Sequence, residues 1–426
     1  TAHFADLTIA GASFEGMARF HMTRFGSCNL WGERFKREVD FSSAEFRIAR
    51  FSDIEFNDKA EFSNVRVETT VDLSGSKFSK DADFSHSNFQ SAKFSEVLFE
   101  GAARFSGTRF EQVDFRGSTF GEVLFQYNEI DSIDCDGVIF REKASFRHVT
   151  CRIANFAKVE FRKDVEFAHC LFKKSLNFSG SAFTAPRMVF TSNTESREPL
   201  AVIIDEGCDL YFDRVRMLDA RSIEFMDIDL GRVTFLHTDV RMMRFLNERW
   251  KEENGRKIVY EESLMKQGKE GDPAAVEELY RRLRHNYEDV LRYADAGQFF
   301  IGEMEMKKRN IAPGIGPVKW IRRNLLSAIG LYGILCKYGE SYWRPVTISA
   351  ITIFAIALLR TGHICLASEF LWSSEVLTTF YENTRRSIFV FFQLSSVDLL
   401  DVAERIWSAL LLGLTFIAIK RHLERR

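Results

Sequence analysis

The residues with the clearest chemical potential are charged side chains within or beside apolar segments. Arg360 lies inside the apolar stretch 345–366, and Asp398 and Asp401 precede a second stretch, 402–419. A charge in such a segment needs a partner, an aqueous path or a route to a polar surface. We expect Arg360 to extend to the outer surface of a membrane, with a protein interface or water-filled path as the alternative. We expect the two aspartates to cap a helix at the membrane boundary, and the alternative is an acidic ring that attracts cations.

Other reactive residue types give weaker signals. His148 and His169 each follow a phenylalanine by two residues, and their spacing predicts stacked, exposed rings rather than a metal site, which needs more ligands. Ser395 and Ser396, between the two apolar stretches, are candidate pore or membrane-interface residues. The chain has no P-loop, H-E-x-x-H motif, nucleophile elbow or kinase signature. We therefore expect no catalysis, no cofactor and no bound metal.

A phenylalanine repeat determines the elements that hold most of these residues. From Phe4 to Phe183 an apolar residue, usually Phe, recurs every five residues and occasionally after six. Neither the 3.6-residue period of a helix nor the two-residue period of a strand places such residues on one face. A solenoid does so when each unit forms one side of a coil and the rings stack in columns. The residues of this ladder that we expect in the core include Phe41, Phe46, Phe84, Phe105, Phe146 and Phe167.

The six-residue steps indicate how many sides each coil has. Most of them lead into every fourth ladder position, as at Phe41, Phe62 and Phe84. Four sides per coil align these insertions on one face, whereas three sides would scatter them. We predict four sides, with the extra residues forming outward bulges. The register falters over 191–198 and resumes at Phe225.

Individual repeat units carry a family resemblance. Ala92-Lys93-Phe94 and Val113-Asp114-Phe115 resemble the A-x-F core of pentapeptide-repeat proteins. Over residues 1 to about 245, this resemblance implies a right-handed quadrilateral β-helix, in agreement with the four sides. Some members of the family imitate DNA with a strongly acidic rod, but here both signs of charge are interspersed. A DNA-mimic inhibitor is therefore the least favoured function, and no nucleic-acid partner is expected.

Cysteine usage and the leading residues bear on the compartment. The seven cysteines form no C-x-x-C pair, and Cys28, Cys135, Cys151 and Cys170 fall on inward positions of the repeat. This pattern indicates core packing in a reducing compartment. No secretory signal precedes the repeats, which favours a cytoplasmic rod. Because the sequence begins in register without methionine, we expect the natural amino terminus to lie upstream.

The pattern becomes helical after the ladder. We predict a β-helix at 1–247, an α-helical connector at 248–310 and a membrane module at 311–426. In the connector, Asp272 as cap and Pro273 as first residue indicate a helix start, and 295–309 reads as a second helix. We expect this helical hairpin to pack between rod and membrane, and the alternative is a coupling or oligomerisation element.

The membrane module begins with basic residues. Lys319, Trp320, Arg322 and Arg323 precede an apolar run, 325–336, that is too short to span a bilayer and reads as an interfacial helix. The stretches 345–366 and 402–419 are the predicted spans, and the alternative is a buried hairpin of a soluble protein. Basic residues concentrate before the first span and after the second, so both termini should be cytoplasmic.

A third apolar run, 387–400, separates the two spans. Span, re-entrant-length segment and span resemble the two-helix pore module of ion channels, and Tyr338-Gly339-Glu340 resembles a segment that precedes this module in some pentapeptide-repeat proteins. Where a potassium filter has T-x-G-Y-G, this chain has Leu394-Ser395-Ser396-Val397-Asp398. That departure removes the basis for a carbonyl-lined potassium filter.

These patterns favour a membrane-anchored oligomer whose helical module forms an ion-channel-like pore. The cytoplasmic rod would then be a gating or recognition surface. The alternative is a non-conducting, membrane-tethered scaffold that binds a protein along the rod. The expected partners are the lipid bilayer, further copies of the chain and a protein on the rod, and the expected location is the cell membrane.

Overall fold

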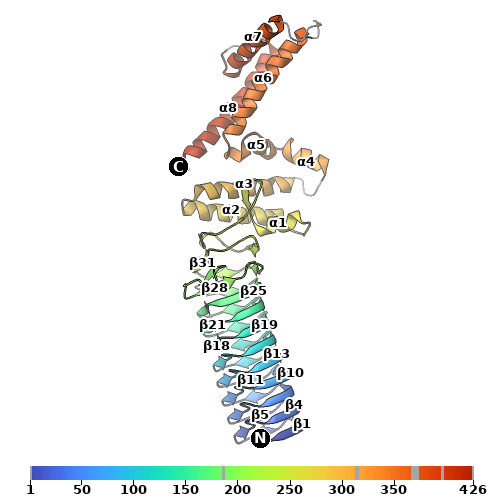
Figure 1. Ribbon diagram of the computed structural model, residues 1–426, viewed down its shortest axis with the longest axis vertical. Helices are drawn as coiled ribbons and strands as arrows, with labels where there is room; N and C mark the ends of the chain where they lie inside the picture. The colour runs from blue at the N-terminus through green and yellow to red at the C-terminus, as the bar shows by residue number, and fades with distance from the viewer. Residues whose placement is uncertain (1, 185–187, 312–315, 366–373, 395–397, 425–426) are drawn as a thin grey trace. The chain divides into compact units, whose positions relative to one another are not determined.

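The computed structural model describes residues 2–184, 188–311, 316–365, 374–394 and 398–424 (Figure 1). Contacts divide the chain into two compact units, Thr1–Asn286 and Tyr287–Arg426. The boundary divides the predicted connector 248–310. Residues 248–286 belong to the unit that contains the solenoid, and residues 287–310 belong to the unit of the carboxy-terminal helices.

The first unit is a parallel β-solenoid of about 11 turns. Among the described residues its largest sheet has 15 strands, and the longer ones hold two ladder positions, as β4 holds Phe25 and Leu30, so that they form two sides of a coil. These strands are β1 (His3–Ala10), β4 (Arg24–Trp31), β7 (Glu45–Ser52), β10 (Arg66–Asp72), β13 (Asn88–Lys93), β16 (Arg109–Asp114), β19 (Glu129–Asp134), β22 (Thr150–Asn155), β25 (Cys170–Asn177), β27 (Met188–Thr191), β28 (Ala201–Ile204), β29 (Asp209–Tyr211), β31 (Ile223–Met226), β32 (Val233–Thr234) and β33 (Arg244–Leu246).

Two further parallel sheets complete the coil, with 10 and 8 strands. The 10-stranded sheet contains β2 (Ser13–Phe14), β5 (Arg34–Phe35), β8 (Glu55–Phe56), β11 (Lys77–Phe78), β14 (Leu98–Phe99), β17 (Thr119–Phe120), β20 (Ile139–Phe140), β23 (Glu160–Phe161), β26 (Ala182–Phe183) and β30 (Arg216–Met217). The 8-stranded sheet contains β3 (Ala18–Arg19), β6 (Val39–Asp40), β9 (Ala60–Glu61), β12 (Ala82–Asp83), β15 (Ala103–Arg104), β18 (Val123–Gln126), β21 (Ala144–Arg147) and β24 (Val165–Ala168).

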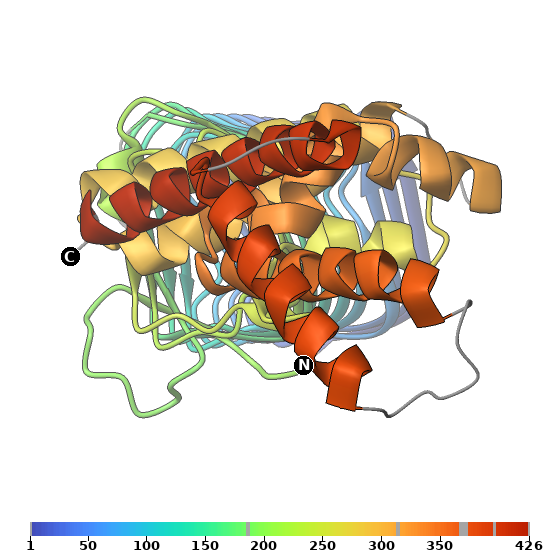
Figure 2. The same ribbon diagram turned by 90° about the horizontal axis from the view of Figure 1, so that it is seen from above.

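The strand register confirms four ladder positions per coil. Phe25 pairs with Phe46, and Phe46 pairs with Val67 on the next coil. In the view along the rod, successive coils lie behind one another (Figure 2). The predicted four-sided solenoid is therefore the observed fold of the amino-terminal unit.

The phenylalanine ladder forms the core. Rings on the same side of successive coils stack nearly parallel, with centroids 5.1 Å apart for Phe84 and Phe105 and 4.8 Å apart for Phe146 and Phe167. Rings on different sides of a coil meet edge to face, the other favoured aromatic geometry. The predicted core residues Phe41, Phe46, Phe84, Phe105, Phe146 and Phe167 are all buried.

The six-residue steps are accommodated in two ways. Most lie in the three-residue connection between the 10-stranded and 8-stranded sheets, such as 36–38, and so align on one face as predicted. The five-residue step after Phe120 has a two-residue connection, in which a Cβ at Gly121 would lie 2.8 Å from the Glu100 carbonyl oxygen. The steps into Leu73 and Phe178 instead produce register shifts within β10 and β25.

The faltering register corresponds to an added strand. After β27, a loop leads to β28, which pairs in parallel between β25 and β27. The ladder then resumes as predicted, because Phe225, Leu230, Phe235 and Val240 are buried.

A small cap covers the last coil. It consists of the antiparallel hairpin β34 (Lys251–Glu253) and β35 (Arg256–Ile258) and of helices α1 (Tyr260–Lys266) and α2 (Pro273–Asp289), whereas the 3-10 turn η1 (Ala220–Ser222) lies earlier, between β30 and β31. The predicted start of α2 is confirmed, since the Ala274 N–H donates to the Asp272 carboxylate at 2.9 Å. Asn286 donates from Nδ2 to the carbonyls of Val240, Arg241 and Met243. These bonds fix α2 on the open end of the core.

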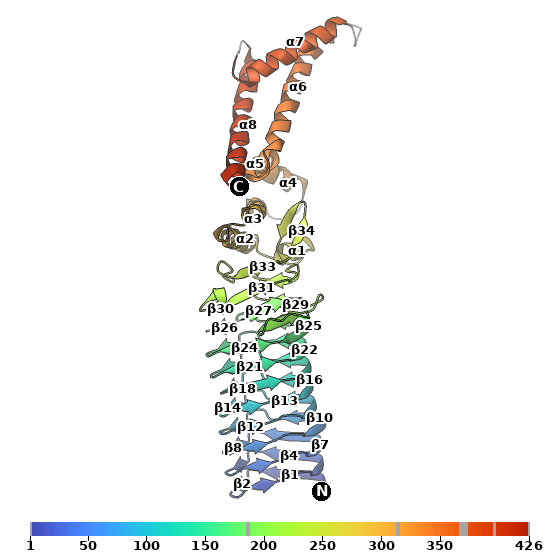
Figure 3. The same cartoon turned by 60° about the vertical axis from the view of Figure 1, so that its left-hand side comes forward.

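The second unit is helical. It contains α3 (Tyr293–Ile311), α4 (Pro317–Asn324), α5 (Ala328–Cys336), the 3-10 turn η2 (Lys337–Gly339), α6 (Trp343–Cys365), α7 (Ser374–Phe391) and α8 (Leu399–Glu424). Helices α6 and α8 run side by side, and α7 crosses one end of the pair (Figure 3). By length and composition, Trp343–Gly362 and Leu399–Arg421 could each span a membrane.

Candidate functional site in the helical unit

The charges singled out in the sequence meet at one end of α6 and α8. The Arg360 Nη2 donates to Asp401 Oδ1 and, at 3.0 Å, to Glu404 Oε2. The side chains are 10%, 1% and 0% exposed, respectively. Arg360 therefore does not extend to a surface but is neutralised between helices. Of the alternatives considered for Arg360, this arrangement corresponds to a protein interface, here between helices of the same chain.

Helix α7 contributes a second layer to the cluster. The Arg386 Nη2 donates to Asp398 Oδ2 and Asp401 Oδ2, each at 2.7 Å. The Ser387 Oγ donates to Glu404 Oε1 at 2.7 Å. Asp401 thus receives both guanidinium groups, while Asp398 remains 61% exposed at the edge. We refer to Arg360, Arg386, Asp398, Asp401 and Glu404 as the ion cluster.

Polar contacts also tie the segment after α7 to α8. The Gln393 Nε2 donates to the Arg405 carbonyl at 3.1 Å and to the Ser408 hydroxyl at 3.0 Å. Arg405 in turn donates to the Gln393 carbonyl. Helix α7 is also bonded to α6, because Asn383 Nδ2 donates to Thr361 Oγ1 at 3.0 Å. Polar side-chain contacts consequently connect α7 and the residues after it to both candidate spans.

The predicted site residues are only partly brought together. Arg360, Asp398 and Asp401 belong to the cluster, whereas Ser395 and Ser396 lie outside the described residues. Asp398 also donates its backbone N–H to Asp401 Oδ2 at 3.2 Å, a capping contact at the start of α8. Of the predicted re-entrant run 387–400, the first residues complete α7 and the last two begin α8.

Sequence reasoning missed Glu404, Arg386 and Ser387 as members of this site. One signal was present, because Asp401 and Glu404 are three residues apart and so lie on one face of a helix. A lone arginine in an apolar helix calls for such a carboxylate partner. Nothing in the local sequence could pair Arg386 with α8, since that contact depends on how α7 crosses the hairpin.

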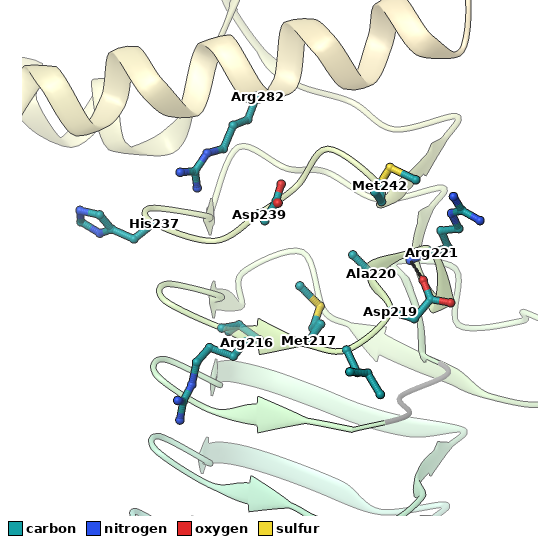
Figure 4. A pocket seen from close by; sticks show the side chains of 11 residues that line it. Arg216, Met217, Asp219, Ala220, Arg221, His237, Asp239, Met242 and Arg282 are labelled. Atoms are coloured by element: carbon teal, nitrogen blue, oxygen red, sulfur yellow. Dashed lines mark hydrogen bonds between the residues drawn. The ribbon is translucent and has the colours of Figure 1, made fainter.

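The rod presents a separate candidate surface, an open groove near its capped end (Figure 4). The groove has a volume of about 810 Å³ and lies between the β30 coil, η1 and α2. Met217, Met242 and the 84%-exposed Leu218 supply its apolar lining. Flexible, polarizable methionines suit a surface that adapts to a partner.

Positive charge borders this groove. Arg216, Arg221 and Asp219 form no ion pair with any described residue, whereas Asp239 is neutralised by Arg241 at 2.7 Å, so the lining keeps an excess of positive charge. Arg282 reaches in from α2 (Figure 4) and donates to the Thr238 carbonyl at 3.1 Å. We refer to this feature as the rod groove.

The predicted stacking of the two histidines is confirmed, with His148 exposed and His169 half-buried. The rings of His148 and His169 are nearly parallel, with centroids 5.3 Å apart, and Tyr127 extends the column at 4.8 Å from His148. Among the described residues, no group of three or more His, Cys, Asp or Glu side chains is placed to hold a metal ion.

Comparisons with known proteins concern the rod. Residues 41–88 and 84–127 match the family model described as pentapeptide repeats (9 copies). A solved structure of trypsin-treated QnrB1, a plasmid-mediated fluoroquinolone resistance protein, is 15% identical and covers 51% of this chain and 92% of its own, with a TM-score of 0.22. No curated protein matches the chain.

Proposed function

We propose that this chain is a membrane-anchored pentapeptide-repeat protein whose helical unit assembles into an oligomeric, ion-channel-like pore; the parallel β-solenoid and the family match over residues 41–88 and 84–127 support the first part of the proposal. The observation that carries the proposal is the order α6, α7, α8, in which the 18-residue helix α7 and the segment after it lie between two longer apolar helices. The ion cluster fastens this middle portion to both of them.

The surface of the helical pair supports a membrane location. Only 17% of the first candidate span and 22% of the second is buried within the chain. Exposed apolar surface of this extent in water would drive association, so it calls for lipid or for neighbouring copies. Because Asp401 and Glu404 neutralise Arg360 within the chain, the surface of α6 presents no unpaired charge from Arg360 to lipid or to a neighbouring copy.

The orientation follows from the basic residues. Lys319, Arg322, Arg323 and Arg344 precede or begin α6, and Lys420 and Arg421 end α8. By the positive-inside rule these ends face the cytoplasm, as do the rod and both termini. The ion cluster then lies toward the outer side of the cell membrane, with Asp398 at the mouth of the module.

Conductance and oligomeric state test the pore proposal together. We expect the purified full chain to conduct in planar bilayers and to form a homo-oligomer by native mass spectrometry. Removing the exposed carboxylate with D398N should reduce the preference for cations over anions, whereas E68Q on the rod should not. A monomer that never conducts would contradict the proposal.

The second candidate function is a non-conducting scaffold tethered to the membrane. The rod groove favours it, since an apolar floor with a polar rim is the anatomy of many protein interfaces. The partner surface would carry carboxylates that face Arg216 and Arg221 and an apolar side chain that meets Met217 and Met242.

Site-specific crosslinking in cells tests the scaffold. A photoreactive residue at position 217 should give a discrete crosslinked partner, whereas one at exposed position 173 should not. The R216E/R221E variant should abolish the product, and deletion of 311–426 should leave it intact in soluble form. Equal crosslinking at both positions would contradict a groove-specific partner.

A further inference from the structure

The segment that leads into the first span is both basic and apolar. Between Glu305 and Glu340 the chain has no acidic residue, whereas Lys319, Arg322 and Arg323 lie on α4 or at its end. None of these three side chains forms an ion pair with a described residue. Their charge is therefore available to an external anion.

The apolar side chains of α4 are equally uncommitted. None of the helix's residues is buried. Val318 is 76% exposed and Trp320 52%, and Leu326, just beyond the helix, is 77% exposed. Basic residues together with exposed Trp and aliphatic side chains are the composition of helices that lie in the headgroup region of a bilayer.

Packing places α4 next to the ends of the candidate spans. A Cβ at Gly330 of α5 would lie 2.1 Å from the Arg323 carbonyl, so the end of α4 sits directly on α5. After α5, the η2 carbonyl of Tyr338 accepts a hydrogen bond from Arg421 of α8 at 2.8 Å. Arg421 also lies over the Phe300 ring of α3, 4.6 Å from its centroid. These contacts join α4, through α5, to the end of the second candidate span.

Building on the membrane anchoring proposed above, we infer that α4 is a docking site for anionic phospholipid headgroups on the cytoplasmic leaflet. The basic residues Lys319, Arg322 and Arg323 bind the headgroups, and Val318, Trp320 and Leu326 enter the interface. This leaflet is negatively charged, and each basic residue near such a surface strengthens binding by about fivefold. Three residues together give roughly a hundredfold preference for an anionic surface.

Amide hydrogen exchange of the full chain in nanodiscs tests the inference. We expect residues 317–326 to exchange at least about tenfold more slowly in nanodiscs with 30% phosphatidylglycerol than in pure phosphatidylcholine. The difference should disappear in the K319E/R322E/R323E variant and shrink at high salt, because salt screens surface charge. Added inorganic phosphate should not reproduce the protection.

Two comparisons make the outcome unambiguous. The control K173E/K174E/R47E reverses three exposed basic residues on the rod that form no ion pair with a described residue, and it should retain the lipid effect. Protection of residues 346–361 in both nanodiscs reports that the first span is inserted. If residues 346–361 are protected in both nanodiscs but α4 exchanges equally fast in the two lipids, the docking site is wrong and the membrane anchoring stands. If residues 346–361 are not protected in either nanodisc, the anchoring on which the docking site rests is wrong.

Discussion

Arg360 shows how a single guanidinium is accommodated in an apolar helix. Asp401 and Glu404 lie one turn apart on α8, so both carboxylates reach it, and Ser387 satisfies a further oxygen of Glu404. A buried pair of this kind contributes little net stability, but removing one partner leaves an uncompensated charge. The cluster is therefore a sensitive point of the helical unit.

Arg360→Gln should lower the free energy of unfolding of the helical unit by about 3–5 kcal/mol, because buried Glu404 loses its counter-charge and Asp401 keeps only Arg386. Adding Glu404→Gln should recover part of that loss, since the second change removes the orphaned charge. Denaturant unfolding in detergent measures both effects. The matched control is R385Q, which alters the exposed neighbour of Arg386. An equal loss in R385Q would contradict this assignment.

Glu261 makes the stability of the rod depend on pH. The carboxylate of Glu261, which belongs to helix α1 of the cap, is buried against the last coil, where Oε1 accepts the Phe235 N–H at 2.6 Å. Burial raises its pKa from 4.5 to about 7, with a smaller contribution from Asp213 and an opposing one from backbone N–H groups. Between pH 4.5 and 7 the folded state therefore keeps the proton on Glu261, whereas the unfolded state has released it. The free energy of unfolding of the rod consequently falls as the pH rises from about 4.5 to 7.

Glu261→Gln keeps a carbonyl acceptor for Phe235 and removes the titration. We expect the variant to be more stable than the parent at pH 8, by up to about 3 kcal/mol, and equal to it at pH 4.5. Urea unfolding at the two pH values measures the difference. A constant offset at both pH values, or the same behaviour in exposed E68Q, would refute the role of Glu261.

At the scale of elements, the ladder could be predicted because one physical requirement repeats. Each five-residue unit must point a ring inward, and a missed step would expose every ring after it. The same reasoning located the extra residues but assigned them all to bulges. Most instead lengthen a connection between sheets, because the backbone there has no neighbouring ladder to disrupt.

Two single-residue deletions test this distinction. Deleting Arg37, which lies in a connection, should shorten a six-residue step to five and preserve the fold, as the two-residue connection after Phe120 already does. Deleting Arg47 within β7 should rotate Phe51 out of the core and prevent folding. Circular dichroism and resistance to trypsin distinguish the outcomes. Equal tolerance of both deletions would be incompatible with the register described.

The helical elements were less accessible to sequence reasoning. The two long apolar helices follow from composition, and their ends agree with the predicted spans within a few residues. The ion cluster could not be derived in the same way, because it depends on the angle at which α7 crosses α6 and α8. Likewise, no repeat could anticipate β28, an added strand that pairs with its own neighbour.

At the scale of the whole molecule, the division into two units has a thermodynamic consequence. The boundary falls within α2, so the cap belongs with the rod and α3 with the helical unit. We expect two unfolding transitions in detergent. Glu261→Gln should move only the transition of the rod, and Arg360→Gln only that of the helices. One transition that both substitutions shift equally would show that the units unfold as a single cooperative body.

The repeated register between coils also bears on how the rod could evolve. Phe25 faces Phe46 through the same backbone pairing that Phe89 makes with Phe110, so the upper and lower surfaces of a coil are nearly interchangeable. A tandem duplication of one coil's coding sequence would regenerate both surfaces without altering the cap. Rod length can therefore drift by whole coils across generations, while the groove near α2 and the helical unit keep their sequences.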